Sequence, residues 1–180
     1  MCIGKLSGRK CPLISRLGTR LVASAFLLPL LGIGCDSHSE KSREVVSFDL
    51  TKLQLHQNDK SSPKQISLIS VVSVSSLPES VRSRIPKMSN PGGRFAAGDV
   101  SVFDTPRRRL VFGGISDRYC LVHYEYGGIA HGYRTALFDL SGSQSKPLWA
   151  HAGGRYASLG QFAKETDPDE LTNEVNEAVF

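Results

Sequence analysis

The sequence lacks the short motifs that mark the common enzyme and cofactor classes. No serine lies in a Gly-x-Ser-x-Gly pattern, which excludes the nucleophile elbow of α/β-hydrolases. The turn-rich stretch Asn90–Phe95 contains Gly92-Gly93-Arg94, but no Gly-Lys-Ser or Gly-Lys-Thr follows, which excludes a P-loop. The histidines and acidic residues lack the spacing of a metal site, so neither a metal nor a cofactor is expected.

Long apolar runs are also missing. The apolar run Leu21–Leu31 is interrupted only by Ser24 and Pro29, and a membrane-spanning helix needs about 20 apolar residues. The run follows five basic residues and no acidic one. These basic residues are Lys5, Arg9, Lys10, Arg16 and Arg20. A basic start, a short apolar core and a small-residue end predict that residues 1–34 are a secretory signal peptide.

The end of this segment carries a further pattern. Gly32-Ile33-Gly34-Cys35 resembles the lipobox of bacterial lipoproteins, in which the cysteine receives a diacylglyceryl thioether and becomes the new amino terminus. The resemblance covers residues 1–35 only. It implies a lipid on Cys35, attachment to a membrane, and a place in the cell envelope that faces the periplasm or the exterior. The alternatives are a plain secreted protein, because Gly32 and Gly34 also fit a small-x-small cleavage site, and an uncleaved anchor.

The predicted mature chain has no net charge. The whole sequence has 22 basic and 17 acidic residues, a formal charge of +5. The five basic residues before Gly34 account for all of the excess, which leaves 17 of each sign after Cys35. The basic character of the whole chain therefore belongs to the signal peptide, and no nucleic-acid partner is expected.

Cysteine is scarce once the signal peptide is removed. Cys2 and Cys11 leave with it, and Cys35 would be lipidated, so Cys120 stands alone. No disulfide within the chain is then expected, and Cys120 is predicted to be a buried structural residue on an apolar strand face. A bridge between Cys35 and Cys120 stays open if Cys35 escapes lipidation.

The segment that follows Cys35 is mostly polar. Residues 35–63 are predicted to be a tether that holds the domain clear of the membrane. Within it, Val45–Leu50 alternates weakly and is predicted to be an edge strand that pairs with Gln65–Val74. Residues 64–180 are predicted to be one globular domain.

The centre of this domain reads as a meander of antiparallel strands. Tyr119–Tyr126 is the strongest strand signal, because it is rich in aromatic and β-branched residues and is followed by Gly127-Gly128. Its neighbours are separated by short turns, which favour antiparallel pairing. The predicted strands are Arg108–Ile115, Tyr119–Tyr126, Tyr133–Leu140 and Pro147–His151, with a further short strand at Val100–Phe103.

Two helices complete the predicted fold. Ser75–Lys87 has a capping-box pattern at Ser76 and Glu79, and Pro86 ends it. A second helix is predicted in the acidic carboxyl-terminal part, with Asp167 as its cap. Neither face of the central strands is purely polar, so the sheet is expected to be covered on both sides. The fold class predicted is α+β, with a single antiparallel sheet of about four to six strands and two helices packed on it.

Charge is distributed unevenly along this domain. Residues 64–163 have 12 basic and 6 acidic residues, whereas the tail from Lys164 has one basic and six acidic residues. We hypothesise that the tail docks on the basic part of its own domain. The three arginines Arg107, Arg108 and Arg109 are not expected to form one patch, because alternation puts Arg108 on one side and the other two opposite it.

Two function classes remain open from these residues. The first is a membrane-anchored envelope lipoprotein that binds a protein, glycan or lipid partner without catalysis. Its candidate binding residues are Tyr119, His131, Tyr133 and Arg134. The second is a small exported hydrolase, because His123 and Glu125 share a strand face and could act as a base and its orienting partner. The binding class is favoured, and the sequence does not predict an oligomeric state.

Overall fold

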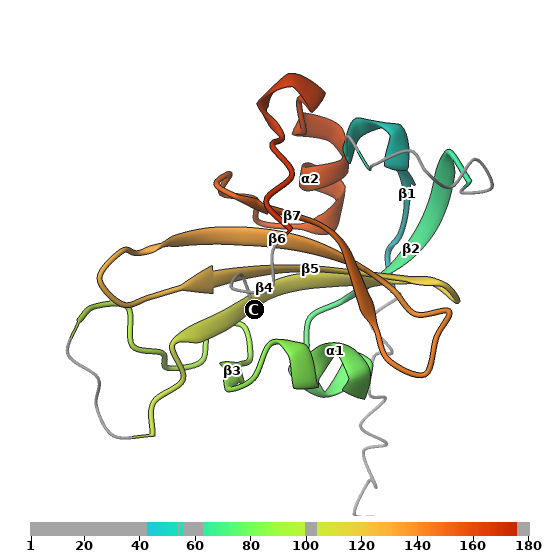
Figure 1. Ribbon diagram of the computed structural model, residues 1–180. Helices are drawn as coiled ribbons and strands as arrows, with labels where there is room; N and C mark the ends of the chain where they lie inside the picture. The colour runs from blue at the N-terminus through green and yellow to red at the C-terminus, as the bar shows by residue number, and fades with distance from the viewer. Residues whose placement is uncertain (1–42, 54, 56–62, 100–103, 176–180) are drawn as a thin grey trace, which may run out of the picture. The chain divides into compact units, whose positions relative to one another are not determined.

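The computed structural model describes residues 43–53, 55, 63–99 and 104–175 (Figure 1). They form an α+β domain with one sheet. The predicted signal peptide, Cys35, most of the tether and the strand predicted at Val100–Phe103 lie outside the described residues. In the described ranges, no helix is long and apolar enough to cross a membrane.

The described residues form one seven-stranded sheet. Its strands are β1 (Val45–Asp49), β2 (Gln65–Val71), β3 (Met88–Ser89), β4 (Arg108–Ile115), β5 (Tyr119–Tyr126), β6 (Gly132–Asp139) and β7 (Lys146–Ala152). The order β1-β2-β4-β5-β6-β7 is antiparallel throughout, and the two-residue β3 pairs parallel with β4. The predicted antiparallel sheet is confirmed, with β1 and β2 pairing as expected.

Short connections fix the meander, as the turn residues indicated. The Ser116 N–H donates to the Tyr119 carbonyl at 2.8 Å, and the Tyr119 N–H donates to the Ser116 hydroxyl at 3.0 Å. These two bonds close the turn between β4 and β5. Gly128 has φ +131°, a conformation that glycine adopts readily, at the turn that leads from β5 to β6.

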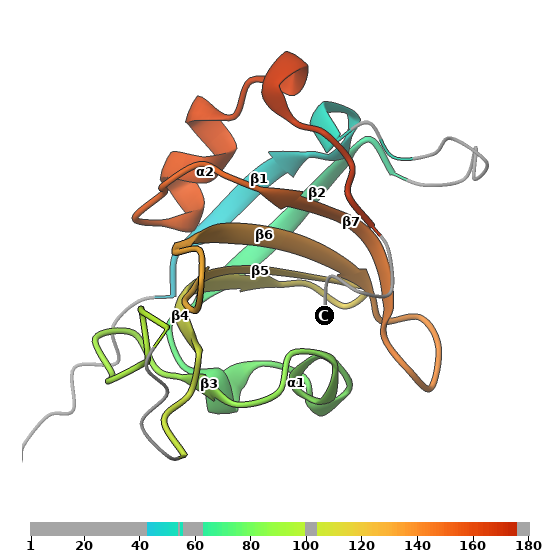
Figure 2. The ribbon, with the colours of Figure 1, turned by 60° about the vertical axis from the view of Figure 1, so that its left-hand side comes forward.

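The two α-helices found in the described ranges cover opposite faces of the sheet (Figures 1 and 2). α1 (Glu79–Arg84) lies on one face and α2 (Leu159–Glu165) on the other. The described residues also form three short 3-10 helices, η1 (Leu50–Leu53), η2 (Val74–Ser76) and η3 (Pro168–Glu170). Both faces of the sheet are therefore buried, which explains why neither face of β5 and β6 is polar.

Alternation along β5 divides the core into two parts. Tyr119 and Leu121 point toward α2 and pack with Trp149 of β7. Cys120 and Val122 point toward α1 and pack with its apolar side chains. Cys120 is fully buried, as predicted, and burial raises the pKa of its thiol to about 12.

A bulge in β4 adjusts which face its side chains reach. The register with β5 shifts between Leu110 and Phe112. Without the extra residue these two side chains would share a face, but Leu110 packs on the α1 side and Phe112 on the α2 side. The bulge thus supplies an apolar side chain to each half of the core.

The helices differ from the sequence-based prediction. α1 is shorter than Ser75–Lys87, because Ser76 belongs to η2 and α1 begins after Pro78 without a side-chain cap. The second α-helix precedes the predicted one. It is α2, whose amino terminus is capped by the Ser158 hydroxyl, which accepts from the Gln161 N–H at 3.1 Å.

The helix predicted at Asp167 is a single 3-10 turn. Asp167 does cap it, since its carboxylate accepts from the Asp169 N–H at 3.0 Å. The chain then continues without helix through residue 175. Leu171 is buried against the α2 side of the core, and the Glu174 N–H donates to the Ala150 carbonyl of β7 at 2.7 Å. These contacts with the core and with the edge of β7 hold the segment extended, in place of a continued helix.

The tail docks, but its contacts are not those hypothesised. Leu171 and the Glu174 backbone make the contacts described above, and the Thr172 hydroxyl lies 3.3 Å from Nδ1 of His151. None of the ion pairs recorded among the described residues involves a tail carboxylate. Apolar burial and backbone hydrogen bonding therefore dock this segment rather than charge.

Candidate functional site

The last residues of β5 carry polar side chains on both faces of the sheet. His123 and Glu125 point toward the α2 side, whereas Tyr124 and Tyr126 point toward the α1 side. Cross-strand pairing places Thr135 and Tyr133 of β6 beside the first pair and Arg134 beside Tyr124. Two separate clusters result, and each has to be considered as a site.

His123 lies inside the core. Its side chain has no exposed surface, and Nδ1 is 2.8 Å from the Thr135 hydroxyl. The ring stacks between Phe112 and Tyr133, at centroid distances of 4.8 and 5.7 Å. Burial lowers the pKa of His123 from 6.5 to about 4, so the ring is neutral at physiological pH.

Glu125 is held by an arginine and a histidine. Its carboxylate accepts from Nε of Arg109 at 2.9 Å and from a second nitrogen of the same guanidinium, and it lies 2.6 Å from Nε2 of His131. Phe95 packs under this guanidinium, with the Arg109 Cζ 4.4 Å from the ring centroid. We call these four residues, Phe95, Arg109, Glu125 and His131, the Glu125 clasp.

The clasp keeps Glu125 ionised. Burial by itself would raise the pKa of the carboxyl, but the hydrogen bonds from His131 and Arg109 outweigh it and hold the pKa below the ordinary value. The clasp also fastens the loop that contains Phe95 to the sheet. The same loop packs on Gly127, where an added Cβ would overlap the carbonyl oxygen of Ala96.

The predicted pair of His123 and Glu125 does share a face but does not form a dyad. The ring of His123 bonds to Thr135, and the Glu125 carboxylate bonds to Arg109 and His131. A histidine base needs a partner that orients it and access to the proton that it removes. His123 has a hydroxyl partner and no exposed surface, so the geometry favours a structural role for both residues.

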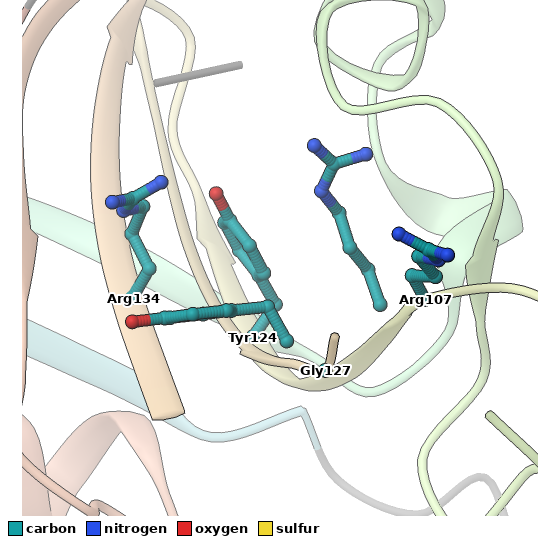
Figure 3. A pocket seen from close by; sticks show the side chains of 6 residues that line it. Arg107, Tyr124, Gly127 and Arg134 are labelled. Atoms are coloured by element: carbon teal, nitrogen blue, oxygen red, sulfur yellow. The ribbon is translucent and has the colours of Figure 1, made fainter. Parts of the chain in front are cut away.

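A cavity of about 250 Å³ opens on the α1 side of the same strands. It is lined by Arg107, Arg108, Tyr124, Tyr126, Gly127 and Arg134, which we call the basic pocket. Arg134 lies on one side of Tyr124 and Arg107 on the other, with Gly127 between Tyr124 and Arg107 in this view (Figure 3). Among the residues that the structure describes, the lining contains three positive charges and no carboxylate.

The arginines of this pocket are fixed in different ways. Arg108 donates from Nη1 to the carbonyl of Pro86, just beyond α1, at 3.3 Å. Arg134 lies over the ring of Tyr126, with its Cζ 5.3 Å from the centroid, as in a cation–π contact. Neither Arg107 nor Arg108 takes part in the ion pairs recorded among the described residues. Their charge is therefore available to an anion.

Tyr124 contributes a buried hydroxyl to the pocket. The residue is 1% exposed, and its hydroxyl lies beside the Arg134 guanidinium, which can donate to the hydroxyl oxygen but cannot accept its proton. Within the described residues this proton has no acceptor. Burial raises the pKa of Tyr124, and the nearby charges of Arg134 and Arg108 offset this only in part. The hydroxyl therefore keeps its proton and can donate it in a hydrogen bond.

The candidate binding residues named from the sequence do not lie together. Tyr119 is 2% exposed and belongs to the core beneath α2. His131 belongs to the clasp and Tyr133 packs next to it, whereas Arg134 faces the basic pocket on the other side of the sheet. Cys35 lies outside the described residues.

The basic pocket combines residues that sequence analysis had separated. Alternation predicted that Arg107 and Arg108 lie on opposite sides, which is wrong, because Arg107 precedes β4 and does not follow its pleat. The prediction holds for Arg109, which points to the clasp. The register of the β5–β6 hairpin could have indicated part of the basic pocket, because it pairs Arg134 with Tyr124.

We expect the stability of the domain to fall by about 2 kcal/mol between pH 7 and pH 5 because of His123. The unfolded chain binds a proton near pH 6.5 and the folded chain only near pH 4. This contribution is therefore fully present above pH 6.5 and is lost as the pH falls toward 4. Urea unfolding at a series of pH values measures it.

The matched control is the double variant His123→Phe with Thr135→Val, which removes the titrating ring together with its hydrogen-bond partner. The decrease between pH 7 and pH 5 should shrink by about 2 kcal/mol in this variant. An equal decrease in the variant and the wild type would show that His123 titrates normally.

Neither a metal site in the described residues nor a related protein points to another functional site. In the part of the chain that the structure describes, no three histidine, cysteine, aspartate or glutamate side chains gather as metal ligands would. Comparisons with protein-family models, with curated proteins and with solved structures found no match. The basic pocket is therefore the candidate site that the contacts of the chain itself single out.

Proposed function

We propose that the chain is a lipid-anchored protein of the cell envelope whose domain binds an anionic ligand and catalyses no reaction. The observation that supports it most is the basic pocket, where three arginines and two tyrosines surround a cavity of about 250 Å³. Guanidinium groups present several N–H donors in a planar fork, which suits carboxylate, sulfate and phosphate groups.

The composition of the pocket favours binding over catalysis. Within the described part of the chain, its lining has no carboxylate, histidine, serine or cysteine that could act as a base or nucleophile. The only other side chains are the two tyrosines. The hydrolase alternative rests on His123 and Glu125, which lie on the other face of the sheet and bond to different partners. We therefore favour the binding class.

The anchor is the second part of the proposal. The lipobox-like Gly32-Ile33-Gly34-Cys35 supports a lipid on Cys35, and the polar residues that follow would let the domain reach away from the membrane. The partners proposed are thus the membrane, through this lipid, and an anionic component of the envelope. A protein or a glycan could carry that anion.

We expect the Cys35→Ala variant to lose its membrane attachment, because the thioether needs the Cys35 sulfur. Intact mass of the membrane-extracted wild type should fit an acylated chain that starts at Cys35. In the variant, that mass should disappear from the membrane fraction. An unmodified wild-type chain that starts at Cys35 would contradict the anchor and favour a secreted protein.

We expect the wild-type protein to bind at least one of acetate, citrate, sulfate and phosphate in isothermal titration calorimetry. The double variant Arg107→Gln with Arg108→Gln should weaken that binding at least fivefold, because each change removes one charge from the pocket. The matched control is Arg82→Gln with Arg84→Gln, which removes the same charge from exposed positions of α1.

The control variant should bind as the wild type does. Equal weakening in both double variants would mean that the anion responds only to net charge. No binding of any anion by the wild type would refute the proposed function.

A further inference from the structure

We infer that the basic pocket is a phosphate site and that the Tyr124 hydroxyl donates a hydrogen bond to the phosphate. This inference rests on the proposed function and makes it more specific, since it names the chemical class of the anion. Four features of the pocket carry it: the directions from which the donors come, the charge of the lining, the buried hydroxyl, and the size of the cavity.

The donors reach the cavity from several parts of the sheet. Arg107 and Arg108 come from the start of β4, Tyr124 from β5 and Arg134 from β6. Figure 3 shows Arg134 and Arg107 on opposite sides of Tyr124. A carboxylate is planar and presents two oxygens, whereas a phosphate group presents three oxygens that point in different directions. Donors that surround the cavity therefore suit the phosphate better.

Charge supports the same assignment. The pocket has three guanidinium groups and no carboxylate in its lining. A single carboxylate would neutralise one of the three charges. A phosphate monoester carries about −1.5 to −2 charges at neutral pH, so it compensates more of the positive charge of the pocket.

Tyr124 gives the pocket a donor that nothing in the described residues uses. Buried polar groups in proteins nearly always have a hydrogen-bond partner, and one without a partner needs an explanation. The proton of the Tyr124 hydroxyl has no acceptor among the described residues, because its neighbour Arg134 is only a donor. Tyr124 is also one of the residues that line the cavity. A phosphate oxygen at this point would satisfy it.

The cavity also limits the ligand. Its volume of about 250 Å³ is below the range of about 300–1,000 Å³ that holds drug-sized molecules. It therefore suits a phosphate group with a small substituent, or the end of a larger molecule that continues out past the exposed Arg107. That phosphate could belong to a soluble monoester or to a lipid headgroup.

The test is calorimetric titration of the full-length protein carrying Cys35→Ser with inorganic phosphate, glycerol phosphate and acetate. We expect the two phosphates to bind at least tenfold more tightly than acetate. Tyr124→Phe should weaken phosphate binding about tenfold. Tyr156→Phe makes the same change on the α2 side of the sheet and should leave phosphate binding unchanged.

A second readout separates binding from a structural role. The proton of the buried Tyr124 hydroxyl has no acceptor within the described residues, and Arg134 keeps its contact with the Tyr126 ring when the hydroxyl is removed. Its removal should therefore leave the thermal stability of the ligand-free protein unchanged. A structural hydroxyl would give the opposite result, a loss of stability in Tyr124→Phe. That loss, or unchanged phosphate affinity in this variant, would overturn the inference.

The outcomes also distinguish this inference from the proposed function. Acetate or citrate binding as tightly as phosphate, with the loss in the Arg107→Gln and Arg108→Gln variant retained, would refute the phosphate assignment alone. No binding of any anion would refute both.

Vesicles decide which source of phosphate the pocket takes. Sedimentation with phosphatidylcholine vesicles, with and without phosphatidic acid, is measured for the Cys35→Ser protein and for the same protein carrying Tyr124→Phe. Both proteins contain residues 1–34, so any membrane affinity of that segment cancels in the comparison. Binding to phosphatidic acid that Tyr124→Phe reduces identifies a lipid headgroup. Equal vesicle binding by both proteins, with glycerol phosphate binding still sensitive to Tyr124→Phe, identifies a soluble monoester.

Discussion

The alternation of side chains along β5 is the constraint on which the rest of the structure depends. β5 lies in the interior of the sheet and is buried on both faces. Successive side chains near the end of β5 therefore point to opposite faces of the sheet. His123 and Glu125 lie on the α2 side, and Tyr124 lies on the α1 side. A shift of one residue in the register would exchange these environments and bury Glu125 against α1.

This constraint separates two kinds of chemistry that are neighbours in the sequence. On one face, the Glu125 clasp compensates its own charges and fastens the loop that contains Phe95. On the other face, the basic pocket collects positive charge without a carboxylate in its lining. Gly127 links the two, because it lines the pocket and also receives the close approach of the clasp loop at Ala96. The clasp thus helps to shape one wall of the pocket from the opposite side of the sheet.

Much of the sheet could be predicted from the sequence, because its signals are local. The aromatic and β-branched residues of β5 and the turn residues around it determine the meander, and the weak alternation at Val45–Leu50 was enough to place β1 beside β2. The helices were predicted less well. α2, which Ser158 caps, has only seven residues, and in so short a helix the spacing of apolar residues carries little information.

The site could be predicted only in part. Period-two alternation correctly placed His123 and Glu125 on one face, but it cannot say which side chains from other strands reach them. Arg109 comes from β4 and His131 from the hairpin, and together they bind the carboxylate that the hydrolase hypothesis needed. Arg107 lines the basic pocket although alternation predicted the opposite face, because it lies just outside β4, where alternation no longer applies.

The most direct test of the account is to observe the arginine side chains themselves while phosphate is added. Nuclear magnetic resonance of the arginine Nε–H groups follows each guanidinium separately. Binding in the basic pocket predicts that the signals of Arg108 and Arg134 shift in a saturable way, while those of Arg109 in the clasp and Arg82 on α1 stay in place. Uniform small shifts of all four signals, or no shift at Arg108 and Arg134, would contradict a phosphate site in this pocket.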